Sequence, residues 1–208
     1  MTKLPTFDEE VRLQTWGYRL VAGLDEVGRG ALAGPVMAAA VILPIGADLP
    51  WLKLVRDSKQ LSPKQRERVF DLVQSAGIAF GLGSVPHATI DRVGIIRATR
   101  MAMAQAVEAL PSRPDFLLID ALSLCEVEIP QKSIIRGDQT SVSIACASIV
   151  AKVSRDRQMT ELDGVYPGYG LARHKGYGTR QHLQCLGLLG PCAIHRRSFA
   201  PVVQLRLA

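Results

Sequence analysis

Residues 19–36 read RLVAGLDEVGRGALAGPV, and this stretch decides the fold. Residues 19–24 predict a strand that ends at the acidic pair Asp25-Glu26, and a glycine-rich turn follows. Val36 to Leu43 is a continuous apolar run closed by Pro44, which predicts a second strand buried on both faces. Neighbouring side chains on a strand point to opposite faces, so we expect the first strand to break at the turn if both acids serve one site.

The same pattern, an apolar strand followed by an acid, recurs further along the chain. Residues 116–119 predict a short buried strand that delivers Asp120, and the apolar pair at 134–135 leads to Asp138. A single acid of this kind is often only a helix cap or a turn residue. Because ligands bind at strand ends in α/β sheets, three such strands favour a cluster of carboxylates. Oxygen ligands without Cys or His select Mg²⁺ or Mn²⁺ over zinc.

The remaining pattern predicts an α/β protein with a mixed sheet flanked by helices. The sequence indicates a further strand over 78–85 and helices over 63–77, 90–110 and 141–163. Three strands come first, and helices and strands then alternate.

The net charge of +6 lies entirely in the last 45 residues. Asp163 is the last acid, and residues 1–163 sum to zero. The basic residues that follow are Arg173, Lys175, Arg180, Arg196, Arg197 and Arg206. Such a region favours a polyanionic partner such as nucleic acid, or equally a solvated surface that keeps the protein soluble.

The composition also excludes several classes of protein. The longest uncharged run, residues 30–47, contains two prolines, so no membrane span is predicted. Acids at positions 8–10 stand where a signal peptide needs apolar residues, so we expect a cytoplasmic protein. The four cysteines show no paired spacing and predict reduced thiols rather than a zinc site or disulfides: Cys125, Cys146, Cys185 and Cys192.

Residues 25–36 closely resemble the N-terminal signature of the ribonuclease HII family. The resemblance runs in the family's order from about residue 20 to residue 202. The segments that carry it are Asp57-Ser58-Lys59, 117–120, 137–138, 144–156, 166–170, 174–179 and 195–199.

This resemblance implies an RNase H-like fold in one structural domain. The catalytic core would span 19–163, with an N-terminal extension at 1–18 and a small, basic, helical substrate-binding region at 164–208 packed on it. The implied catalytic and metal-binding tetrad is Asp25, Glu26, Asp120 and Asp138. Such enzymes cut the RNA strand of RNA–DNA hybrids and the 5′ side of single ribonucleotides in duplex DNA. They leave a 3′-hydroxyl and a 5′-phosphate, using two Mg²⁺ or Mn²⁺ ions.

The resemblance also implies a set of substrate-binding residues. The Gly28-Arg29-Gly30 backbone and Tyr177 match the family's readers of the 2′-hydroxyl. Taken alone, they would be a tight turn and an ordinary loop aromatic.

Other residues are candidates for phosphate contacts. Ser58 and Lys59 stand in a predicted loop, where they could hold a backbone phosphate. Ser148, Lys152 and Arg155 share one helix face. They predict either phosphate contacts or a solvated stripe in which Arg155 pairs with Asp156 or Asp163.

Three positions depart from the family pattern. Gly94 replaces the usual Asn and should weaken a helix-start hydrogen bond. Ala121 stands where Gly is common, so the backbone beside Asp120 must accommodate a Cβ. Cys146 replaces a usual Ala, and we expect it to be buried.

Two other interpretations remain open from the sequence. A ribonuclease HIII-type nuclease usually carries a substantial N-terminal extension, and a non-catalytic hybrid-binding protein would have a disrupted tetrad. We expect a monomer that binds nucleic acid. Residues 204–208 could form a sliding-clamp contact or only a frayed end.

Overall fold

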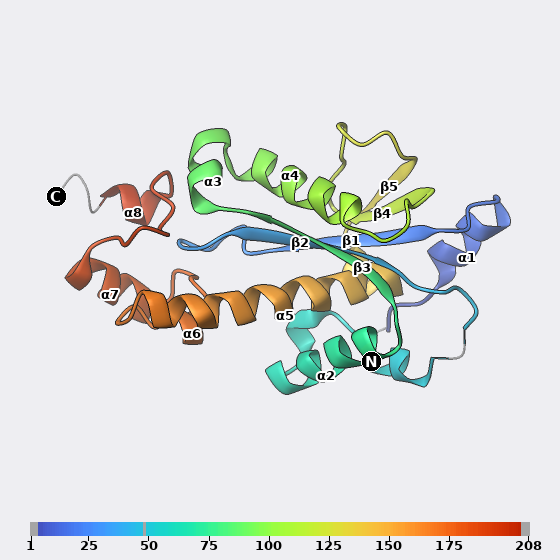
Figure 1. Cartoon of the computed structure of the whole chain (residues 1–208), viewed down its shortest axis with the longest axis horizontal. Helices are drawn as coiled ribbons and strands as arrows, with labels where there is room; N and C mark the ends of the chain where they lie inside the picture. Colours follow the sequence, from blue (N-terminus) through green and yellow to red (C-terminus); the bar gives the residue numbers. More distant parts are fainter. Residues whose placement is uncertain (1–3, 48, 205–208) are drawn as a thin grey trace.

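The computed structural model describes residues 4–47 and 49–204, which contain one five-stranded mixed sheet in the order β3-β2-β1-β4-β5 (Figure 1). β1 pairs antiparallel with β2, and β2 antiparallel with β3. β4 runs parallel to both β1 and β5. The strands are β1 (Val21–Val27), β2 (Val36–Ile42), β3 (Ala79–Val85), β4 (Phe116–Asp120) and β5 (Gln131–Ile134). The predicted fold class is confirmed.

Helices cover both faces of the sheet, with α4 on one face and α5 and α2 on the other (Figure 1). The helices are α1 (Asp8–Thr15), α2 (Pro63–Ser75), α3 (His87–Val93), α4 (Ile95–Glu108), α5 (Val142–Val165), α6 (Leu171–His174), α7 (Arg180–Leu189) and α8 (Ala200–Gln204). Short 3₁₀ turns occur at η1 (Pro50–Leu54), η2 (Ser58–Gln60) and η3 (Gly137–Gln139). None of the helices in the described part of the chain is both long and apolar enough to cross a membrane.

The predicted helix over 90–110 is wrong in one respect, because the structure has two helices there. Gly94 ends α3 and begins α4 with φ +81°, a left-handed conformation that favours glycine. Position 94 contributes no side-chain oxygen, so the first turn of α4 lacks a side-chain cap, in line with the expected weaker helix start.

Strand β2 separates two apolar cores, and all seven of its residues are buried. Ala38 and Ala40 face the core under α4, whereas Ala39 and Val41 face the core under α5 and α2. This alternation follows from the period of two along a strand. A continuous apolar run is therefore what a central strand covered on both faces requires.

Helix α5 packs unusually close to β1 at Gly23. A Cβ built at this position would lie 2.2 Å from the carbonyl carbon of Ser143 and 2.4 Å from the amide nitrogen of Ile144. Both are backbone atoms of α5, so the helix itself would have to move. The close approach sets the distance between the following turns of α5 and the end of β1.

We therefore expect Gly23→Ala to destabilise the protein by about 1–3 kcal/mol or more, as overpacking of a rigid contact does. The measurement is the free energy of unfolding in urea. Gly187→Ala in α7 is the matched control, because a Cβ there meets no atom within 4 Å. That change should stabilise the helix by roughly 0.5–1 kcal/mol. Equal effects of the two substitutions would contradict the proposed contact.

Candidate active site

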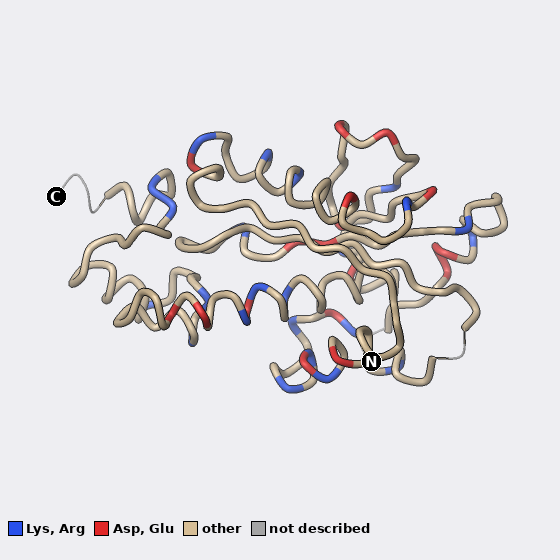
Figure 2. The backbone as a smooth tube through the Cα atoms, in the orientation of Figure 1, with Lys and Arg blue, Asp and Glu red and all other residues tan. Residues whose placement is uncertain are grey.

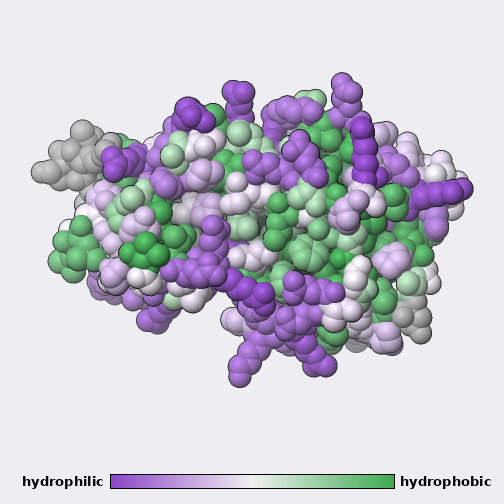
Figure 3. All heavy atoms as spheres, viewed as in Figure 1, coloured by the Kyte–Doolittle hydropathy of each residue, from purple (hydrophilic) through white to green (hydrophobic). Residues whose placement is uncertain are grey.

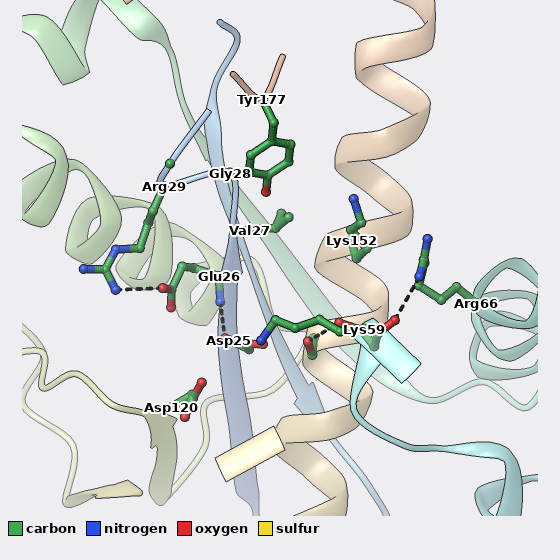
Figure 4. Close-up of a pocket in the computed structure, with 13 residues that line it drawn as sticks. Asp25, Glu26, Val27, Gly28, Arg29, Lys59, Arg66, Asp120, Lys152 and Tyr177 are labelled. Carbon is green, nitrogen blue, oxygen red and sulfur yellow. Dashed lines mark hydrogen bonds and ion pairs between the residues drawn. The ribbon is translucent and has the colours of Figure 1, made fainter. Parts of the chain in front are cut away.

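A cavity of about 460 Å³ opens where β1 and β4 end, beside the middle of α5 (Figure 4). It gathers most of the site residues predicted from the sequence. The lining residues are Asp25, Glu26, Val27, Gly28, Arg29, Gly30, Ser58, Lys59, Arg66, Asp120, Ser148, Lys152 and Tyr177. Two predicted residues, Asp138 and Arg155, do not line the cavity.

The acidic pair enters the cavity from an intact strand. The expectation that β1 breaks at the acidic pair is wrong, because the strand stays paired with β2 through Val27. Both acids nevertheless reach one cavity because β4 pairs with β1 only as far as Leu24 and ends at Asp120. Beyond that point the edge of β1 is open. Side chains from both faces of the strand can bend around this edge.

Burial dominates the electrostatics of the acids. Burial and the charge of Glu26 raise the pKa of Asp25 well above its usual value, although the neighbouring Ser148 hydroxyl opposes this. Burial also raises the pKa of Glu26, while Arg29, whose guanidinium donates to its carboxylate at 3.0 Å, acts to lower it. These carboxylates are therefore held in a region that disfavours their charged form.

Asp138 joins the site through Lys59. Asp138 is 3% exposed in η3, and its Oδ2 lies 3.7 Å from the Lys59 Nζ. Burial and the charges of Asp57 and Asp120 raise the pKa of Asp138. Burial acts to lower the pKa of Lys59, but the surrounding acids, led by Asp138, raise it overall. The Lys59 side chain thus extends across the site as a counter-cation for several carboxylates (Figure 4).

The loops around Asp120 and Lys59 are held by specific hydrogen bonds. The Gly137 amide donates to Asp120 Oδ1 at 2.8 Å. Asp57, which sequence analysis did not assign to the site, accepts from the Lys59 amide at 2.9 Å and from the Gln139 side chain at 3.3 Å. Asp57 therefore ties the loop that carries Lys59 to the loop that carries Asp138.

The predicted phosphate-binding residues lie along the α5 side of the cavity. Ser58 and Ser148 are 3.0 Å apart between their hydroxyl oxygens. Lys152 lines the cavity and forms an ion pair with Asp156 at 2.7 Å. Arg66 is a lining residue that sequence reasoning missed. It follows the Ser62 capping box of α2 and donates to the Ser58 carbonyl, and nothing in this pattern marked it as functional.

The expectation that Arg155 contacts a phosphate is wrong, as is its alternative pairing with an acid. Arg155 is 0% exposed, and its guanidinium donates to three backbone carbonyl oxygens, those of Pro35, Ala33 and Lys175. It faces inward because the chain at 28–35 packs over this part of α5. A Cβ at Gly28 would lie 2.3 Å from the Arg155 Nε.

The two other departures from the family pattern have clear structural settings. Ala121 has φ +51°, a left-handed conformation that costs a residue with a Cβ about 1 kcal/mol. Cys146 is fully buried as expected, and burial raises the pKa of its thiol to about 12. The thiol is therefore an inert part of the core under α5.

The donor set of the cavity suits a hard divalent cation, because it offers carboxylate and hydroxyl oxygens. In residues 4–47 and 49–204, no three His, Cys, Asp or Glu side chains are gathered closely enough to ligate one ion as they stand. The like charges repel one another, and Arg29 beside Glu26 and Lys59 beside Asp138 supply compensating positive charge.

The mixed five-stranded sheet with helices on both faces and acids at the ends of β1 and β4 is the arrangement expected of an RNase H-like protein. The chain belongs to the ribonuclease HII family, whose profile, described as Ribonuclease HII, matches residues 22–202. A relative from Dehalococcoides mccartyi, named Ribonuclease HII, is 54% identical over 198 residues, covering 95% of this chain and 94% of the relative. The protein is thus an endoribonuclease of the ribonuclease H class, and the family match decides against the HIII alternative.

Solved structures share the fold. The ribonuclease H2 of Pyrococcus horikoshii superposes with a TM-score of 0.75 at 23% identity, covering 90% of this chain and 97% of that one. A Bst-RNase HIII structure in complex with Mn²⁺ superposes with a TM-score of 0.65 at 19% identity, covering 90% and 69% of the two chains.

Because burial disfavours the charge of Asp25, we expect Asp25→Asn to stabilise the protein without divalent cations. A raised folded-state pKa makes the charged carboxylate costly at neutral pH. This cost decreases as the pH falls below the folded-state pKa and is gone only below the unfolded-state pKa of about 3.9. The gain should be on the order of 1 kcal/mol at pH 7.5 and should be smaller near pH 4. Chemical unfolding with a chelator at both pH values measures it. Asp71→Asn, whose carboxylate is 68% exposed, should change little.

We further expect Ala121→Gly to raise stability by about 0.5–1 kcal/mol, since glycine adopts the left-handed conformation without a steric cost. The midpoint of urea unfolding reports this change. Ala76→Gly, at the end of α2 where φ is −80°, is the control and should not stabilise. A loss of stability in Ala121→Gly would show that the backbone beside Asp120 is not strained.

Proposed function

We propose that this endoribonuclease nicks duplex DNA on the 5′ side of a single embedded ribonucleotide and also cuts the RNA strand of RNA–DNA hybrids, leaving 3′-hydroxyl and 5′-phosphate ends. One observation carries the proposal: three acids, the Gly28–Gly30 turn and Tyr177 line the same cavity. Acids that support hydrolysis and groups that could sense a 2′-hydroxyl are thus within reach of one nucleotide.

The acids Asp25, Glu26, Asp120 and Asp138 would hold two Mg²⁺ or Mn²⁺ ions. These ions, when bound, would activate water for in-line attack and stabilise the leaving 3′ oxygen. The Mn²⁺ complex of Bst-RNase HIII supports a divalent cation in this fold. The oxygen-only donor set of this chain supports it independently.

The remaining residues would bind and orient the substrate. Tyr177 presents its ring beside Lys152, whose Nζ lies 5.8 Å from the ring centroid, and its hydroxyl points toward the acids (Figure 4). A tyrosine so placed could stack on the sugar next to the ribonucleotide and reject a second hydroxyl. Ser58, Lys59, Ser148 and Lys152 would contact the phosphates on either side.

The distribution of charge supports a nucleic-acid substrate. Basic segments of α5 lie beside the acidic segment of β1 at the centre of the molecule, and α2 carries both basic and acidic segments (Figure 2). Hydrophilic side chains gather over α2 and the neighbouring part of α5 (Figure 3). A polyanion held by this rim would lie across an acidic centre, which needs cations before it can accept a phosphate.

The decisive experiment uses duplex DNA with one ribonucleotide. Nicking should require Mg²⁺ or Mn²⁺, stop on chelation and resume when the cation returns. Asp120→Asn should lower nicking by at least about a hundredfold, because it removes the charge at the reacting centre. The amide oxygen of Asn can still accept from the Gly137 amide, so folding and duplex binding should persist.

Glu108→Gln, exposed at the end of α4 on the other face of the sheet, should retain full activity in the same assay. Metal-independent nicking, or an Asp120→Asn variant that unfolds, would contradict the assigned role of the acids. Activity on long hybrids with none on a single ribonucleotide would overturn the finer substrate assignment.

A further inference from the structure

Residues 195–199 carry part of the family resemblance, and the proposed function gives them no role. The first two, His195 and Arg196, lie beside the chain that follows the glycine turn. Ala31 forms an isolated antiparallel bridge with Tyr177, and Ala33 forms one with His195. Residues 31–33 are thus flanked by Tyr177 on one side and by the His195-Arg196 pair on the other.

His195 reaches Tyr177 through His182. Both imidazoles are 0% exposed, and their Nε2 atoms lie 3.1 Å apart. The Cys192 amide donates to His195 Nδ1 at 3.0 Å, so this nitrogen is an acceptor. His182 Nδ1 lies 3.0 Å from the Tyr177 carbonyl oxygen, which can only accept.

These two backbone groups fix both tautomers. His195 must carry its proton on Nε2 and donate to His182 Nε2, and His182 must carry its proton on Nδ1 and donate to Tyr177. Burial and the neighbouring ring lower the pKa of His195 to about 4, and burial lowers the pKa of His182. Both rings are therefore neutral near pH 7. A directed chain of hydrogen bonds runs from the Cys192 amide to the Tyr177 carbonyl.

Arg196 holds the glycine turn from behind. It is 0% exposed, and it donates to the Arg29 carbonyl at 2.8 Å and to the Gly34 carbonyl at 3.0 Å. In a trans peptide the C=O and N–H point in opposite directions, so the Gly30 N–H points away from Arg196. Gly30 itself lines the cavity.

In the described ranges Arg196 has no carboxylate within ion-pair distance, and its second terminal nitrogen has no hydrogen-bond partner. Its guanidinium carbon lies 5.1 Å from the centroid of the Phe199 ring, which is an uncharged partner. A buried cation without a counter-ion is costly to stability. Apolar packing would be the more stable choice at this position, which points to a functional reason for the guanidinium.

We propose that His195 and Arg196 are positioning residues. They hold Tyr177 and the Gly28–Gly30 turn, the two groups proposed to recognise the 2′-hydroxyl, in the correct position relative to each other. His195, acting through His182, sets the position of Tyr177, and Arg196 sets the Gly28–Gly30 turn. This role rests on the proposed function, because it assumes that the turn and Tyr177 read the ribonucleotide. Neither residue touches the substrate.

The tautomers can be tested without any activity measurement. In protein labelled with ¹⁵N-histidine, the ring nitrogen shifts at pH 7 should show a neutral His182 protonated on Nδ1 and a neutral His195 protonated on Nε2. Assignment uses the His182→Asn variant. A charged ring, or His182 protonated on Nε2, would overturn the proposed role of His195 and His182, whatever the substrate proves to be.

The kinetic test compares variants that keep or remove the donor to Tyr177. His182→Asn can still offer an N–H to the carbonyl, whereas His182→Leu cannot. On single-ribonucleotide duplex, kcat should fall by about a hundredfold in His182→Leu and by only a few fold in His182→Asn, since a misplaced contact of about 1 Å costs this much. The Kd for plain duplex should stay unchanged in both, because the residue is buried.

The proposed role of Arg196 is tested with Arg196→Lys. Lysine keeps the positive charge but lacks the planar guanidinium that donates to two carbonyls at once. The kcat of this variant should fall about tenfold or more with the Kd for plain duplex unchanged, and thermal melting verifies that it folds. Arg113→Met, in an exposed loop at the opposite end of β4, is the control and should match the wild type.

The outcomes separate the two proposals. If the wild type fails to nick a single ribonucleotide, the proposed function fails, and the tautomer result stands by itself. If the wild type nicks the single-ribonucleotide duplex while His182→Leu and Arg196→Lys retain the wild-type kcat, Tyr177 and the Gly28–Gly30 turn do not depend on these residues. The positioning role is then overturned.

Discussion

Asp25 and Asp120 occupy neighbouring backbone positions because β1 and β4 are parallel and their register brings Leu24 opposite Ile119. This enforced proximity of like charges is the constraint on which the rest of the site depends. The sheet supplies the proximity through backbone hydrogen bonds, and burial makes the charges costly. The surrounding loops therefore have to provide positive charge, which Lys59 and Arg29 deliver.

The backbone around the acids is also strained in a consistent way. In the described part of the chain, the non-glycine residues with positive φ are Ala121, Arg136 and Lys175. Ala121 follows Asp120 directly, and Arg136 precedes the Gly137 amide that donates to Asp120. Lys175 lies two residues before Tyr177. A strained backbone conformation persists where the contacts around it hold it in place. Here those contacts come from the loops that form the cavity.

The sheet and the strand-end acids could be predicted from the sequence because both depend on local pattern. The continuous apolar run of β2 and the acid that ends β4 are visible without any tertiary contact. The open edge of β1 could not be predicted, because it depends on where β4 stops pairing. The burial of Arg155 was missed for a similar reason. Helical spacing gives its face but not the chain at 28–35 that packs over this face.

The excess positive charge of the C-terminal region now divides into two kinds. Arg196 is buried, and Lys175 donates to the Asp156 carbonyl and the Thr160 hydroxyl on α5, so both act within the protein. Arg173, Arg180 and Arg197 remain exposed, and Arg206 and most of the predicted clamp-contact segment lie outside the described residues.

The region therefore cannot act simply as a basic wall that attracts a duplex. Arg196 and the half-buried Lys175 donate to backbone carbonyls of segments near the cavity, and only the exposed cations of the region can release counterions from nucleic acid. The same segment would then contribute both a salt-dependent affinity for nucleic acid and a cavity geometry that does not depend on salt. Long-range attraction of a polyanion would depend on the exposed arginines, whereas Arg196 and Lys175 support the backbone around the cavity.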